Sequence, residues 1–155
     1  MAHEIERKFL VTNDTWRRAV TARRHLTQFY LAAGDLSSVR VRILDRTDAR
    51  LTIKSAGPGV RRSEFEYAIP VEDADAMRPL AIGHIIRKQR HIVPAGDLRW
   101  EIDVFQGGHE GLVIAEIELA STDQKFAFPE WLGEEVTHDP RYYNAALARH
   151  PFENL

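Results

Sequence analysis

The sequence predicts a mainly β protein of the α+β class, in which antiparallel strands close into a barrel or form a strongly curved sheet. Eight segments along the chain alternate apolar with charged or polar residues, as strands with two different faces do. Short turn sequences, such as GPG at 57–59 and AGD at 95–97, separate several of these segments and favour antiparallel neighbours. On most segments the charges share one sign, and this pattern predicts where the charged faces point.

Composition limits the class of protein. The 155 residues fit one domain, 1–155, with enough chain to bury a substantial core. The chain has no cysteine, so disulfides, thiolate nucleophiles and cysteine metal sites are excluded, and a cytoplasmic location is expected. No apolar run reaches the length of a membrane span, and the acidic start, MAHEIERK, does not resemble a signal peptide. With 21 basic and 23 acidic residues, bulk charge predicts neither nucleic acid nor membrane as a partner.

The first segment, HEIERKFLV at 3–11, shows the alternation clearly. Glu4, Glu6 and Lys8 would lie on one face of a strand, and Ile5 and Phe9 on the other. Seven further strands are predicted from LTQFYLA (26–32), VRVRI (39–43), LTIK (51–54), SEFEYAI (63–69), IIRKQRHIV (85–93), LRWEIDVF (98–105) and GLVIAEIELA (111–120).

Three helices are predicted between and after these strands. A Thr/Asn/Asp cluster at 12–14 indicates an amphipathic helix over about residues 14–23. The acidic start of VEDADAMRPLA (71–81) indicates a second helix, which Pro79 should shorten or kink. In HDPRYYNAALARH (138–150), Asp139 is placed as an N-cap and Pro140 as the first helical residue of the third.

Successive charges on one face mostly have the same sign, which a solvated outer face does not predict. Arg40 and Arg42 form one such pair; the others are Glu64 with Glu66, Lys88 with Arg90, Glu101 with Asp103, and Glu116 with Glu118. Such side chains lie about 7 Å apart, and each uncompensated pair costs roughly 2 kcal/mol at an effective dielectric constant near 20. Acidic and basic pairs therefore need each other, or a ligand that carries both signs.

If the charged faces point inward, they form a polar lumen in which carboxylates oppose Lys and Arg. The apolar faces would then point outward and need the helices as cover. Clustered carboxylates suit Mg²⁺ or Mn²⁺, and Lys and Arg are complementary to phosphate oxygens. The pattern therefore predicts a site for a polyanion together with a divalent metal, an arrangement suited to phosphoryl transfer.

Over its whole length the sequence resembles the CYTH superfamily, also called triphosphate tunnel metalloenzymes. EIERK at 4–8 matches the ExExK signature of that family, and the likeness continues in order through VRVR, LTIK, EFEY, KQR, WEID, AEIEL and DPRYYN. The resemblance implies an eight-stranded antiparallel closed β-barrel with a hydrophilic tunnel and a few covering helices. It also implies dependence on a divalent metal and triphosphate substrates.

The resemblance also implies roles for individual residues. The metal ligands that it implies are Glu4, Glu6, Glu116 and Glu118, with Asp103 and Glu64 as ligands of a second metal or as partners bridged by water. Its phosphate-binding residues are Lys8, Arg40, Arg42, Lys54, Lys88 and Arg90. Catalytic roles are also predicted for Tyr30 and Lys88. Lys88 could orient or deprotonate a water because surrounding cations lower a lysine's pKa, while the acidic groups of the lumen oppose that shift. Tyr30 lies in QFYL where family members often have QGYL, so Phe29 is a departure.

The leading prediction is a metal-dependent hydrolase of inorganic tripolyphosphate, with Mg²⁺ or Mn²⁺ as cofactor. An adenylate cyclase of the CYTH type, a thiamine or nucleoside triphosphatase and a non-catalytic polyphosphate-binding module remain alternatives. The sequence does not identify any organic group attached to the phosphates, because loops rather than the phosphate-binding residues would recognise that group. A triphosphate and a divalent metal are the expected partners, and a homodimer is left open.

Overall fold

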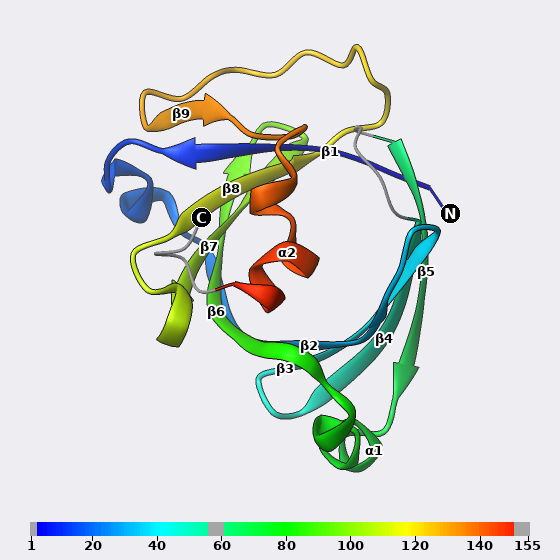
Figure 1. Cartoon of the computed structure of the whole chain (residues 1–155). Coiled ribbons are helices and arrows are strands. Elements are labelled where there is room, and N and C mark those ends of the chain that lie inside the picture. Colours follow the sequence, from blue (N-terminus) through cyan, green and yellow to red (C-terminus); the bar gives the residue numbers. More distant parts are fainter. Residues whose placement is uncertain (1–2, 56–60, 151–155) are drawn as a thin grey trace.

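The computed structural model describes residues 3–55 and 61–150, and the side chains of residues 5–55 and 63–150. Nine antiparallel strands lie within these ranges: β1 (His3–Val11), β2 (Ala22–Ala33), β3 (Ser37–Leu44), β4 (Asp48–Ser55), β5 (Arg61–Ile69), β6 (Ile82–Ala95), β7 (Leu98–Gln106), β8 (Val113–Glu118) and β9 (Leu132–Glu135). They form one sheet in the order β5-β4-β3-β2-β6-β7-β8-β1-β9, which curves around a central space (Figure 1). The predicted mainly β, antiparallel fold is confirmed.

The two edges of β1 explain how the sheet departs from the predicted barrel. One edge pairs with β8 over residues 6–10. The other edge is divided, because residues 3–5 pair with β5 whereas residues 9 and 11 pair with β9. Two details of the prediction are therefore wrong: there are nine strands rather than eight, and the sheet is not a closed barrel. The physical reason lies in the pairing of β1. Within the described residues, β5 pairs with β1 over only three residue pairs, and β9 pairs with a part of the same β1 edge that β5 leaves unpaired.

The predicted helix over residues 14–23 is also wrong. Only a short 3-10 helix, η1 (Thr15–Ala19), forms there. The residues that follow it join β2, where Ala22 and Arg23 lie opposite Ile92 and His91 of β6. Pairing with a neighbouring strand therefore overrides the local preference for helix.

The other two helices lie where they are predicted but are short. α1 (Val71–Ala76) ends before Pro79, which lies in the 3-10 helix η2 (Arg78–Leu80). The last helical region is divided into the 3-10 helix η4 (Pro140–Tyr142) and α2 (Asn144–Arg149), and Asp139 caps η4 by accepting a hydrogen bond from the Arg141 backbone N–H at 3.1 Å. In the part of the chain that the structure describes, no helix has the length and apolar character needed to cross a membrane.

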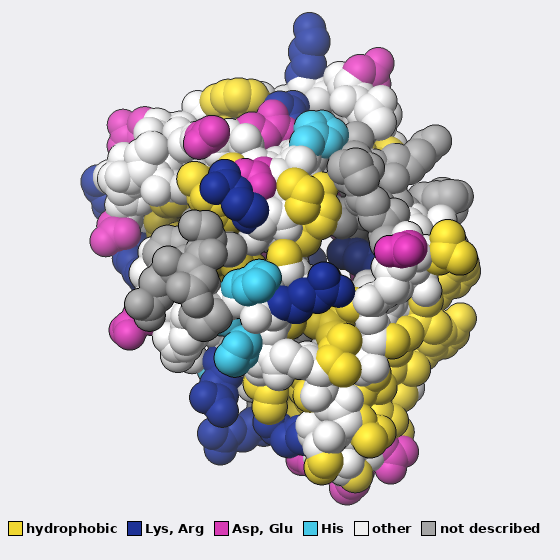
Figure 2. Space-filling model, viewed as in Figure 1, with side chains coloured by type: hydrophobic (Ala, Val, Ile, Leu, Met, Phe, Trp, Pro, Cys, Tyr) yellow, Lys and Arg dark blue, Asp and Glu magenta, His cyan; other side chains and the backbone are white. Residues whose placement is uncertain are grey.

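The apolar faces of the strands point outward, as predicted. One outer cluster contains Phe9, Trp16, Trp100 and Trp131, and is covered by η1 and the segment that leads to β9. A second cluster is covered by α1 and contains Phe29, Val41, Ile43, Ala49 and Ala74. On β5 this cover ends, since Phe65 and Tyr67 are 45% and 56% exposed. Hydrophobic side chains are correspondingly visible over β4 and β5 in Figure 2.

The C-terminal helix α2 lies inside the curve of the sheet rather than on its outer face (Figure 1). Its Leu147 packs against an inward-facing apolar cluster that contains Tyr30, Ile86, Phe105 and Ile114. The end of the helix is also held by polar contacts, because the buried His109 ring lies at hydrogen-bond distance from the carbonyls of Leu147 and His150. α2 therefore fills an apolar part of the lumen and leaves the charged part open.

Gly83 makes the close approach of β6 to α2 possible, and this contact gives a testable prediction. Gly83 has φ +72°, and a Cβ atom there would lie 2.3 Å from the carbonyl oxygen of Ala148. Gly83→Ala should therefore lower the free energy of unfolding by roughly 2–4 kcal/mol, through backbone strain plus the clash. Gly96→Ala is the matched control, since φ is +63° but no described atom lies within 4 Å of that Cβ. We expect it to cost only about 1 kcal/mol.

Urea denaturation of both variants measures the difference. Equal losses at the two positions would show that α2 does not pack on Gly83 as the structure indicates.

Candidate functional site

The lumen holds a cavity of about 240 Å³ whose described lining is entirely polar. Its walls come from seven strands and the first residue of α2, because each of these strands presents charged residues on its inward face. The lining residues are Glu6, Arg40, Arg42, Lys54, Glu64, Glu66, Arg90, Glu101, Glu116, Glu118 and Asn144. The predicted polar lumen, with carboxylates and basic groups facing one another, is confirmed.

Most of the predicted site residues line this cavity: Glu6, Arg40, Arg42, Lys54, Glu64, Arg90, Glu116 and Glu118. Lys8 and Tyr30 line an adjoining cavity of about 220 Å³, which shares Glu6, Lys54 and Asn144 with the first. Lys88 and Asp103 lie behind the lining, with side chains 0% and 1% exposed. The side chain of Glu4 is outside the described residues.

Two uncharged residues of the lumen, Gln28 and Asn144, are not predicted from the sequence. Gln28 is fully buried on β2 and accepts a hydrogen bond from Nε of Arg42 at 3.0 Å. Asn144 reaches the lumen because α2 turns inward, where the sequence predicts an outer cover. A pattern based on charge sign cannot find neutral residues. For Asn144, the only signal is its place in the DPRYYN motif.

Asp103 is the centre of a buried cluster of charges. It lies opposite Arg90 across β6 and β7, and Arg90 binds it through Nε–Oδ1 at 2.7 Å and Nη2–Oδ2 at 2.8 Å. Lys88 Nζ forms an ion pair with the same carboxylate, 2.6 Å from Oδ2. Burial raises the pKa of Asp103, but Arg90 and Lys88 outweigh this effect and hold that pKa below its ordinary value. Both carboxylate oxygens are thus already bound by cations.

The amine of Lys88 differs from an ordinary lysine amine. Burial lowers its pKa to about 7; Asp103 opposes this shift, and the nearby positive charges of Arg90 and Arg42 add to it. At neutral pH a substantial fraction of Lys88 is therefore the free amine. This residue can take up or hold a proton at the base of the lumen.

Several buried donors in the lumen lack acceptors. Among the described residues, Nε of Arg40 and Nε2 of Gln28 are buried without a hydrogen-bond partner. Burial and the charges of Arg40 and Arg90 lower the pKa of Arg42 to about 9, so positive charge in this part of the lumen is incompletely balanced. Unsatisfied buried donors are costly, and a bound anion with several oxygens would satisfy them. The basic side of the lumen therefore fits a polyanion.

The acidic side of the lumen provides oxygen ligands of the kind that Mg²⁺ and Mn²⁺ prefer. The side chain of Glu6 lies close enough to that of Glu116 to lower its pKa, and Glu118 lies opposite Glu6 across β1 and β8. Burial raises the pKa of Glu116, but Lys8 and Arg90 outweigh it and hold that pKa well below its usual range. Within the described side chains, however, no three acidic or histidine groups gather closely enough to form a complete metal site. The donor set fits a hard cation that takes its remaining ligands from water or from a bound phosphate.

The adjoining cavity lies between β1, β2 and the C-terminal segment. Lys8 is 4% exposed, and its Nζ donates a hydrogen bond to the carbonyl of Tyr142 at 3.2 Å and lies 5.5 Å from the centre of the Tyr143 ring. Tyr30 belongs to the apolar cluster beneath α2. The C-terminal segment thus forms one wall of the cavity that adjoins the charged one.

Comparisons with known proteins agree with this geometry. The CYTH domain family matches residues 2–143. An inorganic triphosphatase of Acetivibrio thermocellus is 39% identical over 156 residues, covering 100% of this chain and 99% of the relative. An inorganic triphosphatase of Nitrosomonas europaea is 40% identical over 152 residues, covering 94% and 96%. A crystal structure of an inorganic triphosphatase superposes with a TM-score of 0.67 at 35% identity, covering 96% of this chain and 95% of that one.

The ion pair between Lys88 and Asp103 gives a prediction about proton binding. Because the Asp103 carboxylate raises the pKa of Lys88, Asp103→Asn should lower that pKa further below 7. The ¹³Cε shift of Lys88, titrated by NMR and assigned with Lys88→Met, measures it. Glu101→Gln is the matched control, since Glu101 pairs with Arg90 and Arg99 and does not contribute to the Lys88 shift. An unchanged or higher Lys88 pKa in Asp103→Asn would contradict the assigned pairing.

Proposed function

This chain belongs to the CYTH family, and from that membership we propose that it hydrolyses the terminal phosphate of triphosphates, with inorganic tripolyphosphate as its substrate. The observation that carries the proposal is the agreement between the two full-length relatives named inorganic triphosphatases and a lumen lined by opposed carboxylates and guanidinium groups. The family is metal-dependent in general, and the acidic residues of this lumen fit a hard divalent cation.

The basic residues bind and orient the triphosphate. Arg40, Arg42 and Arg90 enter the charged cavity from two neighbouring regions of the sheet, and Lys54 adds a fourth positive group. The unsatisfied Nε of Arg40 and the amide of Gln28 supply donors that a phosphate oxygen can accept from. Lys8, in the adjoining cavity, extends the row of cations toward the C-terminal segment. Binding energy from the non-reacting phosphates can then hold the terminal phosphate in line for attack by water.

We propose that the metal takes its protein ligands from among Glu6, Glu116 and Glu118, with Glu64 on β5 and Glu4 on the same strand as Glu6 as further candidates. Because no three described acidic side chains gather closely enough to form a complete site, water and phosphate oxygens would supply the remaining ligands. Mg²⁺ or Mn²⁺ at these carboxylates would supply charge neutralisation for the phosphates and a more acidic water. Asp103 was predicted as a metal partner, but its oxygens are bound by Arg90 and Lys88. We propose instead that it orients these two cations.

The predicted catalytic role of Lys88 remains a proposal: its pKa of about 7 suits proton uptake, but its side chain lies behind the cavity lining, so it would receive the proton indirectly rather than from the attacking water. The predicted catalytic role of Tyr30 remains a proposal; its position in the adjoining cavity suits contact with a phosphate that enters there. The entirely polar lining of the charged cavity favours an inorganic chain over a substrate with a purine or thiamine ring. Cytoplasmic location remains a prediction from the sequence, and a homodimer remains open.

The acidic ligands give the first test of this function. Glu116→Gln and Glu118→Gln should each lower metal-dependent phosphate release by roughly 100-fold, because an amide keeps the shape of the side chain but loses the charge that holds a hard cation. Phosphate release at a series of free Mg²⁺ concentrations measures the loss and any shift in metal requirement. Glu134→Gln, at an exposed position of β9, is the control and should leave both unchanged. Normal activity of the lumen variants at the same Mg²⁺ would remove these residues from the metal site.

The length of the basic row gives the second test. Pyrophosphate has one phosphate fewer than tripolyphosphate and cannot contact all of the basic residues at once. We therefore expect tripolyphosphate to be hydrolysed with a much higher kcat/KM than pyrophosphate, on the order of 100-fold, at matched free Mg²⁺. Equal rates would show that the extended row is not used. Formation of cyclic AMP and pyrophosphate from ATP would instead favour the cyclase.

A further inference from the structure

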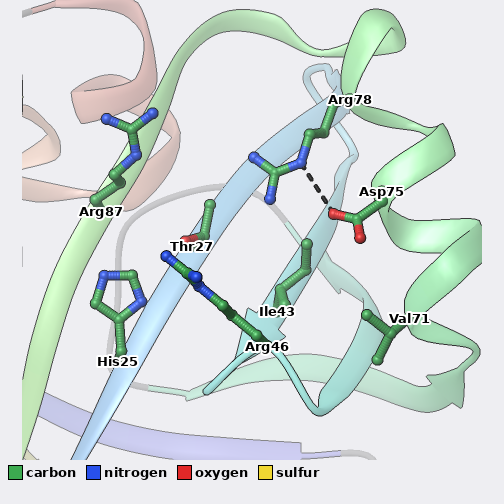
Figure 3. A pocket seen from close by; sticks show the side chains of 8 residues that line it. All are labelled: His25, Thr27, Ile43, Arg46, Val71, Asp75, Arg78 and Arg87. Atoms are coloured by element: carbon green, nitrogen blue, oxygen red, sulfur yellow. Dashed lines mark hydrogen bonds and ion pairs between the residues drawn. The ribbon is translucent and has the colours of Figure 1, made fainter.

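A third cavity, of about 440 Å³, lies on the outer side of the sheet, away from the lumen. It is lined by His25, Thr27, Ile43, Arg46, Val71, Asp75, Arg78 and Arg87 (Figure 3). The view in Figure 3 shows side chains from β2, β3 and β6 forming its floor, with α1 on one side. In the whole-molecule view of Figure 2, Lys and Arg side chains gather on the lower side of the protein, to the left of the region where Figure 1 shows α1.

Strand alternation separates this outer cavity from the lumen. Thr27 lies directly opposite Arg87 of β6 and Ile43 of β3, so the three side chains form a row across three neighbouring strands. The residues that follow Thr27 and Arg87 in sequence, Gln28 and Lys88, are on the inward face. The outer cavity therefore uses the opposite face of the same strands.

The lining of the outer cavity carries excess positive charge. It contains three guanidinium groups and one carboxylate, that of Asp75, which accepts a hydrogen bond from Nε of Arg78 at 3.1 Å. Among the described residues, Arg46 and Arg87 make no ion pair or side-chain hydrogen bond. Their charges are thus balanced only by solvent, although they border a cavity.

The neighbouring acids do not supply the missing charge. Asp45, next to Arg46 in the hairpin turn, accepts hydrogen bonds from Arg24 Nε at 3.0 Å and from the His25 backbone N–H at 2.8 Å. Asp48, on the other side of the turn, also pairs with Arg24, at 3.6 Å. Both carboxylates are therefore bound by Arg24, and Arg46 has no acidic partner among the described residues.

The backbone of Arg46 supports a binding role for this side chain. Asp45 and Arg46 have φ values of 51° and 62°, and the Thr47 N–H donates to the Leu44 carbonyl at 3.0 Å, which defines a two-residue hairpin turn. Glycine or asparagine is favoured at the second position of such a turn, and an arginine there costs about 1 kcal/mol. Asp45 recovers stability through its hydrogen bonds to β2, whereas Arg46 has no such contact among the described residues. A strained residue without local compensation points to a role in binding.

We propose that the outer cavity is a second anion site, which binds a short inorganic oligophosphate through the guanidinium groups of Arg46, Arg78 and Arg87. Planar guanidinium groups suit phosphate oxygens, and groups placed around a cavity of about 440 Å³ can contact more than one phosphate. The hydroxyl of Thr27, on the floor, is a further donor. No Phe, Tyr or Trp is among the described lining residues, and the imidazole of His25 is the only aromatic ring among them. The site is independent of the reaction proposed for the lumen.

NMR titration of the ¹⁵N-labelled protein in EDTA tests the proposal, with inorganic pyrophosphate as the probe. The backbone amides of His25 and Thr27 should shift in a saturable manner. The double variant Arg46→Ala/Arg87→Ala should weaken the affinity reported by these amides at least tenfold. Orthophosphate should bind wild-type protein at least tenfold more weakly than pyrophosphate, because it cannot span the guanidinium groups.

The matched control is Arg18→Ala/Lys125→Ala, which removes the same charge from exposed positions outside both cavities. It should leave the His25 and Thr27 titration within twofold of wild type. Tripolyphosphate hydrolysis by Arg46→Ala/Arg87→Ala should also stay within twofold, so failure of the outer site and failure of the lumen activity are distinguishable. Absence of saturable shifts at His25 and Thr27, equal affinity for the two phosphates, or equal weakening by both double variants would overturn the proposal.

Discussion

Balance of buried charge inside the curved sheet is the constraint on which the rest of this molecule depends. The ion pairs of Asp103 with Arg90 and Lys88 lie almost wholly out of solvent. Removing one partner of such a cluster leaves an uncompensated charge, at a cost of roughly 3–5 kcal/mol. β6 and β7 must therefore keep the register that places Arg90 opposite Asp103. That register also places Glu101 of β7 and Arg90 of β6 together on the wall of the lumen.

A charged interior obliges the apolar faces of the strands to find cover elsewhere. α1 covers Phe29, Val41 and Ile43, and the segment before β9 covers the tryptophan-rich cluster around Trp100. α2 lies on the inner face instead, since it enters the lumen and packs Leu147 against inward-facing apolar residues. The lumen is thereby divided into a packed apolar part and a charged part, and only the charged part is available to a polar ligand.

The same alternation provides two basic surfaces from one set of strands. On the inner face, guanidinium groups oppose carboxylates, so metal and phosphate can each balance one sign. On the outer face, Arg46 and Arg87 have no acidic partner among the described residues, and Arg78 shares only its Nε–H with Asp75. This difference in charge balance separates a site suited to metal-dependent chemistry from one suited to anion binding alone.

The sequence by itself determined the strand segments, the inward direction of the charged faces and the identity of most lumen residues. Period-two alternation encodes the face of each residue, and like-sign pairs such as Arg40 with Arg42 require an opposing charge. The tertiary structure decided what depends on contacts distant in sequence. It replaced the predicted first helix by a short 3-10 helix followed by the start of β2, because residues 22–25 pair with β6, and it added β9 at an edge that local sequence does not reveal. It also placed Asn144 in the lumen and both oxygens of Asp103 on Arg90 and Lys88, because only the assembled sheet sets which side chains share a buried space.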